Sequence, residues 1–303
     1  MRDAILAWYD ETGRSLAFRA TRDPYAILVS ELMAQQTQAA RAAEAWTAWM
    51  TRFPTVEALA AAPVAGVLRA WAGLGYNRRA IQLQRAAKVI VADHGGSVPD
   101  TVEGLRALPG VGPYTARAVA AIAFGLPVGA VDTNVRRVLG RVVAGGAEGL
   151  ATAELQALAD AAVPADRPGD WTHALMDVGA GPCRPRSPRC PDCPAAAWCR
   201  YAAGERVVPR ASGGVATPRR PVAAFPSTTR WLRGRIVART RDAADGAWIP
   251  FGGAIGDHDS AAVREAVVRL GSEGLLEVRE TPNGPEARLP GSLPDPASSV
   301  GHG

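Results

Sequence analysis

The stretch LPGVGPYTARAVAAIAFGLPVGAVD, residues 108–132, decides the fold. It opens with a turn containing Gly110 and Gly112, which tolerate backbone conformations that larger residues do not. Tyr114–Phe124 is apolar and predicts a helix. A glycine-rich turn before a helix leaves backbone N–H groups exposed at the positive helix end, where a phosphate can bind. The turn alone is also typical of an ordinary packing corner. Asp132, which would place a carboxylate beside the phosphate, favours a binding site.

The composition permits two domains and favours an anionic partner. The chain has 303 residues, 48% of them apolar, which is enough for a sizeable core. Its formal net charge is +5, and Lys88 is the only lysine. An excess of arginine favours a polyanion, although many ordinary enzymes are equally basic. The chain opens without a signal-like leader, and no apolar run approaches the about 20 residues of a membrane helix, so we expect a cytoplasmic protein without a membrane partner.

A single acid interrupts the apolar segment PYAILVSELMAQQTQ, residues 24–38. The segment predicts a helix with Asp23 as its cap and Pro24 at its first position. Burial of Glu31 in this helix would raise its pKa, so that the carboxyl is protonated near neutral pH and can donate a proton to a base. From the residue alone, a partly exposed glutamate or a structural ion pair is the more frequent situation.

The four cysteines lie in one short segment with the spacing C-x6-C-x2-C-x5-C: Cys183, Cys190, Cys193 and Cys199. A disulfide framework would spread the cysteines along the chain, so this grouping indicates a bound metal. The spacing alone fits zinc and an iron–sulfur cluster equally well.

Together these motifs resemble the helix-hairpin-helix DNA glycosylases, the superfamily of endonuclease III and the MutY adenine glycosylases, over about residues 1–205. The run SELMAQQTQ resembles the MutY signature, in which the glutamate is the catalytic acid, whereas endonuclease III has glutamine there. Asn134 matches an asparagine of MutY enzymes. The resemblance implies that Glu31 and Asp132 are the catalytic carboxylates, that Tyr114 lies beside them, and that Asn134 orients a carboxylate by a hydrogen bond.

The resemblance also implies a partner and a cofactor. The partner is double-stranded DNA with a mispaired base, and the protein is expected to act as a monomer associated with the nucleoid. The cofactor is a [4Fe–4S] cluster held by the four cysteines, with arginines of the same loop as phosphate contacts. In the run GLGYNRRA, residues 73–80, the tyrosine would be the wedge that enters the duplex. The expected DNA-binding residues are Gln35, Gln36, Thr37, Tyr76, Arg78, Gly110 and Gly112.

The expected activity is removal of adenine opposite 8-oxoguanine or guanine, without strand cleavage. Tyr114 occupies the place where bifunctional members carry a Schiff-base lysine, and a β-lyase needs an amine nucleophile. Three alternatives stay open. Altered neighbours of the site, Phe18 and Ala34, allow a glycosylase that removes thymine from G·T mismatches. An endonuclease III-like lyase is opposed by Glu31, Asn134 and the missing lysine. A non-catalytic DNA-binding protein is opposed by the paired carboxylates.

The expected fold is mainly α: a two-lobed, endonuclease III-like helical fold with a helix-hairpin-helix and a [4Fe–4S] loop, followed by a small C-terminal domain. Helix, strand and turn signals in that domain suggest a winged helix. The domain has a faint similarity to a Nudix box, but Val268 and Arg269 occupy positions where that motif needs glutamates to bind metal, so a Nudix domain is not expected. The expected divisions are residues 1–21 with 128–205 as the cluster lobe, 22–127 as the six-helix lobe, 206–228 as linker, 229–290 as C-terminal domain, and 291–303 as disordered tail.

Some smaller expectations concern single segments. Ser15–Arg19 is expected to be an extended entry strand that offers Arg19 to a phosphate, and Arg79 is expected to hold a phosphate beside Arg78. Asp100 is expected to cap the short helix before the hairpin. Trp46 and Trp49 have the helical spacing of core residues.

Overall fold

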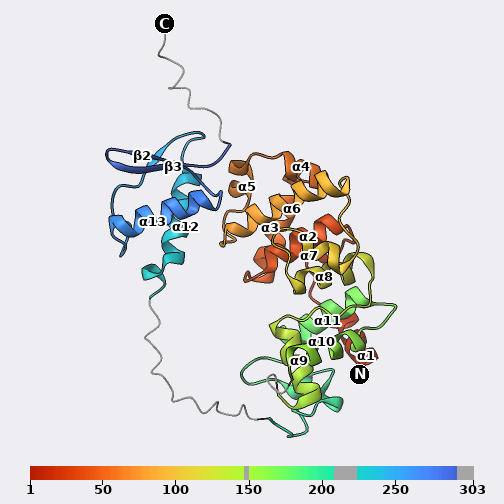
Figure 1. Ribbon diagram of the computed structural model, residues 1–303. Coiled ribbons are helices and arrows are strands. Elements are labelled where there is room, and N and C mark those ends of the chain that lie inside the picture. The colour runs from red at the N-terminus through yellow and green to blue at the C-terminus, as the bar shows by residue number, and fades with distance from the viewer. Residues whose placement is uncertain (147–149, 208–223, 292–303) are drawn as a thin grey trace. The chain divides into compact units, whose positions relative to one another are not determined.

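The computed structural model describes residues 1–146, 150–207 and 224–291, and within them it is mainly helical (Figure 1). Most of the expected linker and tail lies outside the described residues. The chain forms two compact units: Met1–Trp46 with Val98–Val215, and Thr47–Ser97 with Ala216–Gly303. The predicted boundaries between lobes stay predictions. None of the described helices is both long enough and apolar enough to cross a membrane.

The first unit contains most of the helices discussed here. They are α1 (Arg2–Thr12), α2 (Pro24–Ala34), α7 (Val102–Ala107), α8 (Pro113–Phe124), α9 (Thr133–Ala144), α10 (Thr152–Ala162) and α11 (Pro168–Ala180), with short 3-10 turns η1 (Ala17–Arg19), η2 (Cys190–Asp192) and η3 (Ala196–Trp198). Helix α3 (Ala39–Arg52) begins in this unit and ends in the second.

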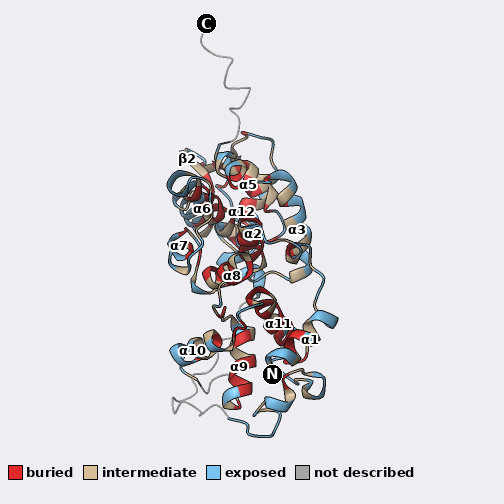
Figure 2. Cartoon of the chain, turned by 90° about the vertical axis from the view of Figure 1, so that its right-hand side faces the viewer, coloured by how far each residue is buried: buried red, intermediate tan, exposed pale blue. Residues whose placement is uncertain are grey.

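Helix α2 is buried along nearly its whole length, from Tyr25 to Met33 (Figure 2). As expected, Pro24 starts the helix and the carboxylate of Asp23 accepts hydrogen bonds from two backbone N–H groups of the first turn. The helix packs against α8. Because almost every side chain of α2 is apolar, the helix is a core element. A polar side chain buried within it costs free energy unless it is hydrogen-bonded or paired.

The hairpin between α7 and α8 forms as the sequence predicts. Gly110 has φ +80°, a left-handed conformation that strains any residue with a side chain. Gly112 is the cap residue of α8, and Pro113 is its first position. The expected cap of α7 is wrong by one residue: the side chain of Thr101, and not that of Asp100, accepts the hydrogen bond from Gly104 N–H.

Helices α1, α9, α10 and α11 share one hydrophobic core. Its buried side chains include Ile5, Val135, Leu139, Trp171 and Val178. Cys183 belongs to the same core, so the cysteine loop is attached directly to the helices that precede it. Asp132 caps α9 and Gly145 ends the helix in a left-handed conformation.

The expected entry strand is wrong. Residues 17–19 form the 3-10 turn η1, and the Arg19 side chain, only 8% exposed, forms an ion pair with Asp177. The turn lets the guanidinium reach a buried carboxylate far along the chain, and the same pairing removes Arg19 from the candidates for phosphate binding.

The second unit combines three helices of the N-terminal half with the C-terminal domain. They are α4 (Val56–Ala61), α5 (Val64–Ala70) and α6 (Arg78–His94), followed by η4 (Phe225–Ser227), α12 (Thr229–Asp242), β1 (Ile249–Pro250), α13 (Ser260–Ser272), β2 (Glu277–Thr281) and β3 (Gly284–Arg288). The buried rings of Trp49 and Trp71 pack edge to face, with centroids 5.5 Å apart, so the expectation that Trp49 is a core residue is confirmed. Trp46 is only half-buried, and its Nε1 donates to the Ala26 carbonyl at 2.9 Å.

The small sheet of the C-terminal domain is antiparallel, with strand order β1-β3-β2. Val278 pairs with Ala287 in the hairpin that the sequence predicts. The two-residue strand β1 was not expected, because so short a strand carries no alternation of its own. A small C-terminal domain containing a sheet is therefore confirmed, and its winged-helix character stays a prediction.

Candidate active site

Glu31 lies on α2 in an apolar environment and is only 8% exposed. Burial raises the pKa of Glu31 from 4.5 to about 7; a hydrogen bond from Tyr114 opposes the shift and the charge of Asp132 adds to it. A carboxyl with this pKa is substantially protonated near neutral pH. Glu31 can therefore act as a proton donor, which Glu31 could not do with an ordinary pKa.

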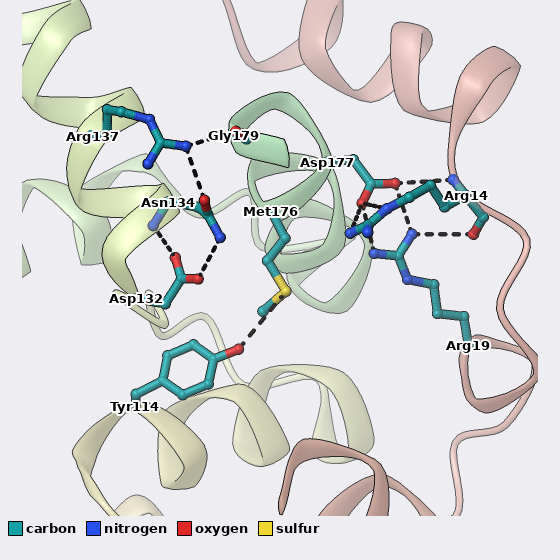
Figure 3. Close-up of polar contacts among 9 residues, drawn as sticks. All are labelled: Arg14, Arg19, Tyr114, Asp132, Asn134, Arg137, Met176, Asp177 and Gly179. Carbon is teal, nitrogen blue, oxygen red and sulfur yellow. Dashed lines mark hydrogen bonds and ion pairs between the residues drawn. The ribbon is translucent and has the colours of Figure 1, made fainter. Parts of the chain in front are cut away.

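Tyr114 is the second residue of α8, directly after the hairpin. Its hydroxyl hydrogen-bonds Glu31 and lies 3.8 Å from the sulfur of Met176 on α11 (Figure 3). Burial raises the pKa of Tyr114 well above 10, and the nearby carboxylates of Glu31 and Asp132 add to the shift. Tyr114 is thus a neutral hydrogen-bonding group close to both acids, and it offers no nucleophilic amine.

Asp132 is held by hydrogen bonds at the N-terminus of α9 (Figure 3). Its Oδ1 accepts from the backbone N–H groups of Asn134 at 2.8 Å and Val135 at 2.7 Å. Its Oδ2 accepts from the Asn134 side-chain amide at 2.9 Å. Three donors hold this carboxylate in place at the positive end of a helix, where negative charge is stabilised. The structure thus brings together the predicted residues Glu31, Tyr114, Asp132 and Asn134.

A residue that the sequence analysis did not select, Arg137, supports Asn134 from the next turn of α9. Its Nη2 donates to Asn134 Oδ1 at 2.9 Å and to the Gly179 carbonyl at 2.6 Å, and its Nε donates to the Cys183 carbonyl at 2.8 Å. The spacing of three residues between Asn134 and Arg137, which places both on one helix face, is the signal that could have revealed it.

Gly179 is a second residue that sequence reasoning missed. A Cβ added at Gly179 would lie 2.6 Å from the Cβ of Asn134, so only glycine lets α11 approach α9 at this point. Because Asn134 then contacts Asp132, the absence of a side chain at Gly179 helps to fix the carboxylate.

Asp177 is a third carboxylate near the site, but its pairing gives it a structural role. Arg19 binds it with two hydrogen bonds of 2.8 Å, and Arg14 donates from Nε at 2.7 Å and from the backbone at 3.0 Å (Figure 3). Burial alone would raise the pKa of Asp177, but the hydrogen bonds from these arginines lower it overall. Asp177 follows Met176, the residue that contacts Tyr114, so this ion cluster anchors α11 at the site.

The end of α2 carries the predicted glutamines. Gln35 Nε2 donates to Thr115 Oγ1 at 3.1 Å, which joins α2 to the start of α8. Gln36 has φ +54°, a conformation rare for a residue with a side chain. The Thr37 hydroxyl donates to the Gln35 carbonyl at 3.3 Å, which stabilises the turn. The three predicted residues thus form one strained turn next to the hairpin helix.

In the hairpin, the two glycines serve different purposes. Gly110 is required by its positive φ. At Gly112 the backbone is extended, and an added Cβ would meet no atom within 4 Å. The protein's own packing therefore does not require glycine at position 112, and the open space there would allow another molecule to approach the backbone.

The predicted wedge loop lies in the second unit. Tyr76 has φ +45° and is 37% exposed, between the left-handed Gly75 and α6. Arg78 is exposed at the start of α6. Arg79 differs from the expectation: its Nη2 donates to the Leu74 carbonyl at 3.0 Å, and burial lowers its pKa to about 10. Arg79 thus stabilises the loop through this hydrogen bond, and it is not proposed as a phosphate contact.

The four cysteines surround a small cavity that Arg141 also lines. All four are free thiols, and Arg141 Nη1 lies 3.4 Å from Cys183 Sγ. In the described part of the chain no group of three or more His, Cys, Asp or Glu residues is arranged to hold a single metal ion. Four sulfurs around a common cavity fit a group larger than one ion, and the arginine would complement a negatively charged one.

Comparison with known proteins identifies the class to which this site belongs. Residues 29–160 match the HhH-GPD superfamily of base excision DNA repair proteins. A thermostable thymine-DNA glycosylase is 33% identical, with a TM-score of 0.63 over 67% of this chain and 95% of that one. Endonuclease III trapped on DNA is 25% identical, with a TM-score of 0.58 over 67% of this chain. The endonuclease III-like fold is therefore confirmed.

Relatives in sequence are more specific. The adenine DNA glycosylase of Mycobacterium tuberculosis (strain ATCC 25618 / H37Rv) is 45% identical over 77% of this chain and 76% of its own length. That of Mycolicibacterium smegmatis is 43% identical, over 78% and 79%. The human adenine DNA glycosylase is 44% identical over 66% of this chain, which spans only 39% of the human protein. The chain belongs to the adenine DNA glycosylase family.

Proposed function

We propose that this protein is a monofunctional DNA N-glycosylase of base excision repair that hydrolyses adenine from A opposite 8-oxoguanine or A opposite guanine. One observation carries the proposal: the buried acid Glu31, with a pKa of about 7, shares a site with Asp132, a carboxylate that three hydrogen-bond donors hold in place. Hydrolysis of a glycosidic bond requires such a pair, one carboxyl that can donate a proton and one that can stabilise positive charge on the sugar.

Glu31 supplies the proton in this mechanism. Protonation of N7 makes adenine a better leaving group, because the electron pair of the breaking bond between the sugar C1′ and the base N9 then flows into a cationic ring. Tyr114 holds the Glu31 carboxyl by a hydrogen bond and so keeps it aimed at a flipped base. Burial excludes the bulk water that would otherwise lower the pKa of Glu31 and take up its proton.

Asp132 stabilises the positive charge that develops on the sugar as the bond breaks. Its geometry is fixed beforehand by Asn134, and through Asn134 by Arg137, so little reorganisation is needed when the charge appears. Water then adds to C1′, and Glu31, now ionised, can accept the proton that the water loses. The products are free adenine and a DNA strand with an abasic site.

Strand cleavage is not expected from this site. A β-lyase forms a Schiff base with C1′, which needs a primary amine. Tyr114 lies beside the two acids, and the only lysine of the sequence, Lys88, lies on α6, a helix that carries none of the predicted catalytic residues. The abasic product is therefore expected to remain intact until alkali cleaves it.

DNA binding would use the turn at the end of α2, the wedge loop and the hairpin. We propose that Gln35, Gln36 and Thr37 contact the base opposite the adenine, and that Arg78 binds a phosphate. The open space at Gly112 supports a second phosphate contact by the hairpin backbone. We propose that the protein acts as a monomer at chromosomal DNA.

The cysteine loop would hold a [4Fe–4S] cluster. We propose Cys183, Cys190, Cys193 and Cys199 as the ligands because they line one cavity. The cluster, when bound, would serve as a structural cross-link and supply no step of the reaction. It would fix a loop whose exposed arginines, Arg184, Arg186 and Arg189, are suited to phosphate contacts.

A second candidate is removal of thymine opposite guanine, favoured by the 33% identity to a thymine-DNA glycosylase. Duplexes that differ in one base pair separate the candidates: A opposite 8-oxoguanine, A opposite G, T opposite G, and A opposite T, each with and without alkali. We expect cleavage only after alkali and only with the first two. Glu31→Gln should abolish it while the matched change at an exposed glutamate of α10, Glu154→Gln, should not. Activity on T opposite G alone, or cleavage without alkali, would contradict the proposal.

A further inference from the structure

Within the second unit, the wedge tyrosine contacts the C-terminal domain. The guanidinium of Arg230, on the first turn of α12, lies 4.1 Å from the centroid of the Tyr76 ring. The same guanidinium lies 5.5 Å from the ring of Phe225, a residue of η4 that is 57% exposed. A planar guanidinium stacks well on aromatic faces, so Arg230 joins the two rings into one group.

Tyr76 needs such support because its backbone is strained. A non-glycine residue at φ +45° costs free energy and persists only where its surroundings hold it. Arg79 and Trp71 hold the backbone of the loop: Arg79 donates to the Leu74 carbonyl and Trp71 Nε1 donates to the Gly75 carbonyl at 3.0 Å. These bonds are made to the backbone of the loop, and the Arg79 guanidinium also lies 5.5 Å from the centroid of the exposed Tyr76 ring. Arg230 is the contact that reaches the ring most closely.

The C-terminal domain is fixed on the helices that carry the loop. Arg69 of α5 pairs with Asp245 at 3.0 Å, Arg85 of α6 donates to the Glu273 carbonyl at 3.2 Å, and Ala65 N–H donates to the Pro290 carbonyl at 2.9 Å. These three contacts come from different parts of the domain and hold it against α5 and α6. The position of Arg230 beside Tyr76 therefore depends on the folded C-terminal domain.

The charge of α12 indicates which partner this group would meet. Its sequence TRWLRGRIVARTRD contains five arginines and one acid, Asp242 at the last position. Arg233 is paired with Glu273 inside the domain, whereas Arg230 faces the exposed rings. Aromatic rings interleaved with arginine are typical of surfaces that bind a nucleic-acid strand.

We propose that Arg230 is a positioning residue for Tyr76, through which the C-terminal domain sets how strongly the enzyme prefers adenine opposite 8-oxoguanine over adenine opposite guanine. The inference rests on the proposed function. As a wedge, the Tyr76 ring would enter the duplex near the mispair, so its tilt would affect how the base opposite the adenine is accommodated. The C-terminal domain would thus affect discrimination of the opposite base through the wedge loop, and it would need no base-binding pocket of its own.

The test uses the full-length protein and the ratio of single-turnover rates for adenine opposite 8-oxoguanine and opposite guanine. Arg230→Ala should lower this ratio by about fivefold, the size expected for one exposed cation–π contact. Arg230→Lys should lower it similarly, since lysine keeps the charge but loses the flat stack. Arg235→Ala, the same change at an exposed position of α12, should leave the ratio within about twofold.

A double mutant decides whether Arg230 acts through the tyrosine. In a Tyr76→Ala background, Arg230→Ala should have no further effect on the ratio. Equal effects of Arg230→Ala and Arg235→Ala, or a full effect of Arg230→Ala without the tyrosine, would overturn the proposal. Unchanged melting temperatures would show that the variants remain folded.

A spectroscopic measurement separates this proposal from the proposed function. 2-Aminopurine placed beside the base opposite the adenine reports stacking of the wedge by its fluorescence. Arg230→Ala should change the signal of the bound complex and should not change it in the Tyr76→Ala background. If the wild-type protein released no adenine, the proposed function would fail while this fluorescence result would still support or contradict the role of Arg230.

Discussion

The middle of α2 and the N-terminus of α9 each present one carboxyl group to the same site. The surroundings of the two carboxyl groups differ in burial and in the number of hydrogen-bond donors. Around Glu31 the helix is apolar and buried, so the charged form is disfavoured and the pKa rises to about 7. Around Asp132 two backbone N–H groups and one amide donate to the carboxylate. The same chemical group, a carboxyl, therefore takes a different role at each place. At Glu31 burial makes it a proton donor, and at Asp132 two backbone N–H groups and an amide hold it as a counter-charge for the sugar.

The largest effect is expected from removing the acid. Glu31→Gln keeps the size of the side chain but has no proton to give, so the single-turnover rate of adenine release should fall by about 10²–10⁴-fold. DNA affinity, measured by equilibrium binding, should change little. An equal loss in Glu154→Gln, at the exposed position on α10, would show that the loss does not come from the site.

Removing the anion should have the next largest effect. Asp132→Asn preserves an N-cap of similar quality, so α9 should remain folded, but the sugar cation loses its counter-charge. We expect adenine release to fall by about 10²–10³-fold with the melting temperature nearly unchanged. Asp132→Ala should additionally lose about 1 kcal/mol of stability because the cap is removed. If Asp132→Asn retained full activity, the cap would be the whole role of Asp132.

The raised pKa of Glu31 also predicts a cost in stability that depends on pH. Folding favours the protonated carboxyl, so Glu31 costs nothing below about pH 4.5, and the protein loses stability as the pH rises from there to about 7. The full cost is at most about 3 kcal/mol. Glu31→Gln should therefore stabilise the protein more at pH 8 than at pH 5, as measured by denaturant unfolding. The same gain at both values would contradict the burial of an ionisable group.

A smaller effect is expected from the support of Asp132. Asn134→Ala removes one of the three donors, and we expect adenine release to fall by about tenfold, which is about 1.4 kcal/mol. Gly179→Ala should reduce activity in the same direction, since the added Cβ would press on Asn134. Full activity of Gly179→Ala would show that the close approach of α11 to Asn134 does not help to fix the carboxylate.

The sequence predicted the features that depend on neighbouring residues. The cap at Asp23, the hairpin glycines and the helix that starts after Asp132 follow from local chemistry, and all form as expected. Glu31 could be selected because it is the only acid in an apolar helix. Asp177 also lies in a largely apolar helix, although that helix carries a second acid, Asp170. The fold distinguishes Asp177 from Glu31, because it brings two arginines to Asp177.

Features that depend on how the chain folds back on itself could not be predicted. Arg19 was expected on DNA, but its partner Asp177 lies 158 residues further along the chain. Arg79 was expected on a phosphate, and it binds the carbonyl groups of its own loop instead. Arg137 and Gly179 support Asp132 only because α9 and α11 pack together. Local patterns thus identify the reacting groups, and packing decides which charged residues serve the structure.

The pH dependence of adenine release tests the central claim most directly. Single-turnover rates on A opposite 8-oxoguanine would be measured for the wild-type protein between about pH 5.5 and 9. If Glu31 must be protonated and has a pKa of about 7, the rate should be level at low pH and fall by about tenfold per unit above 7. Asp132→Asn should release adenine more slowly at every pH, but its rate should decrease above pH 7 in the same way. A rate that is flat or rises through this range would contradict the assignment of Glu31 as the acid.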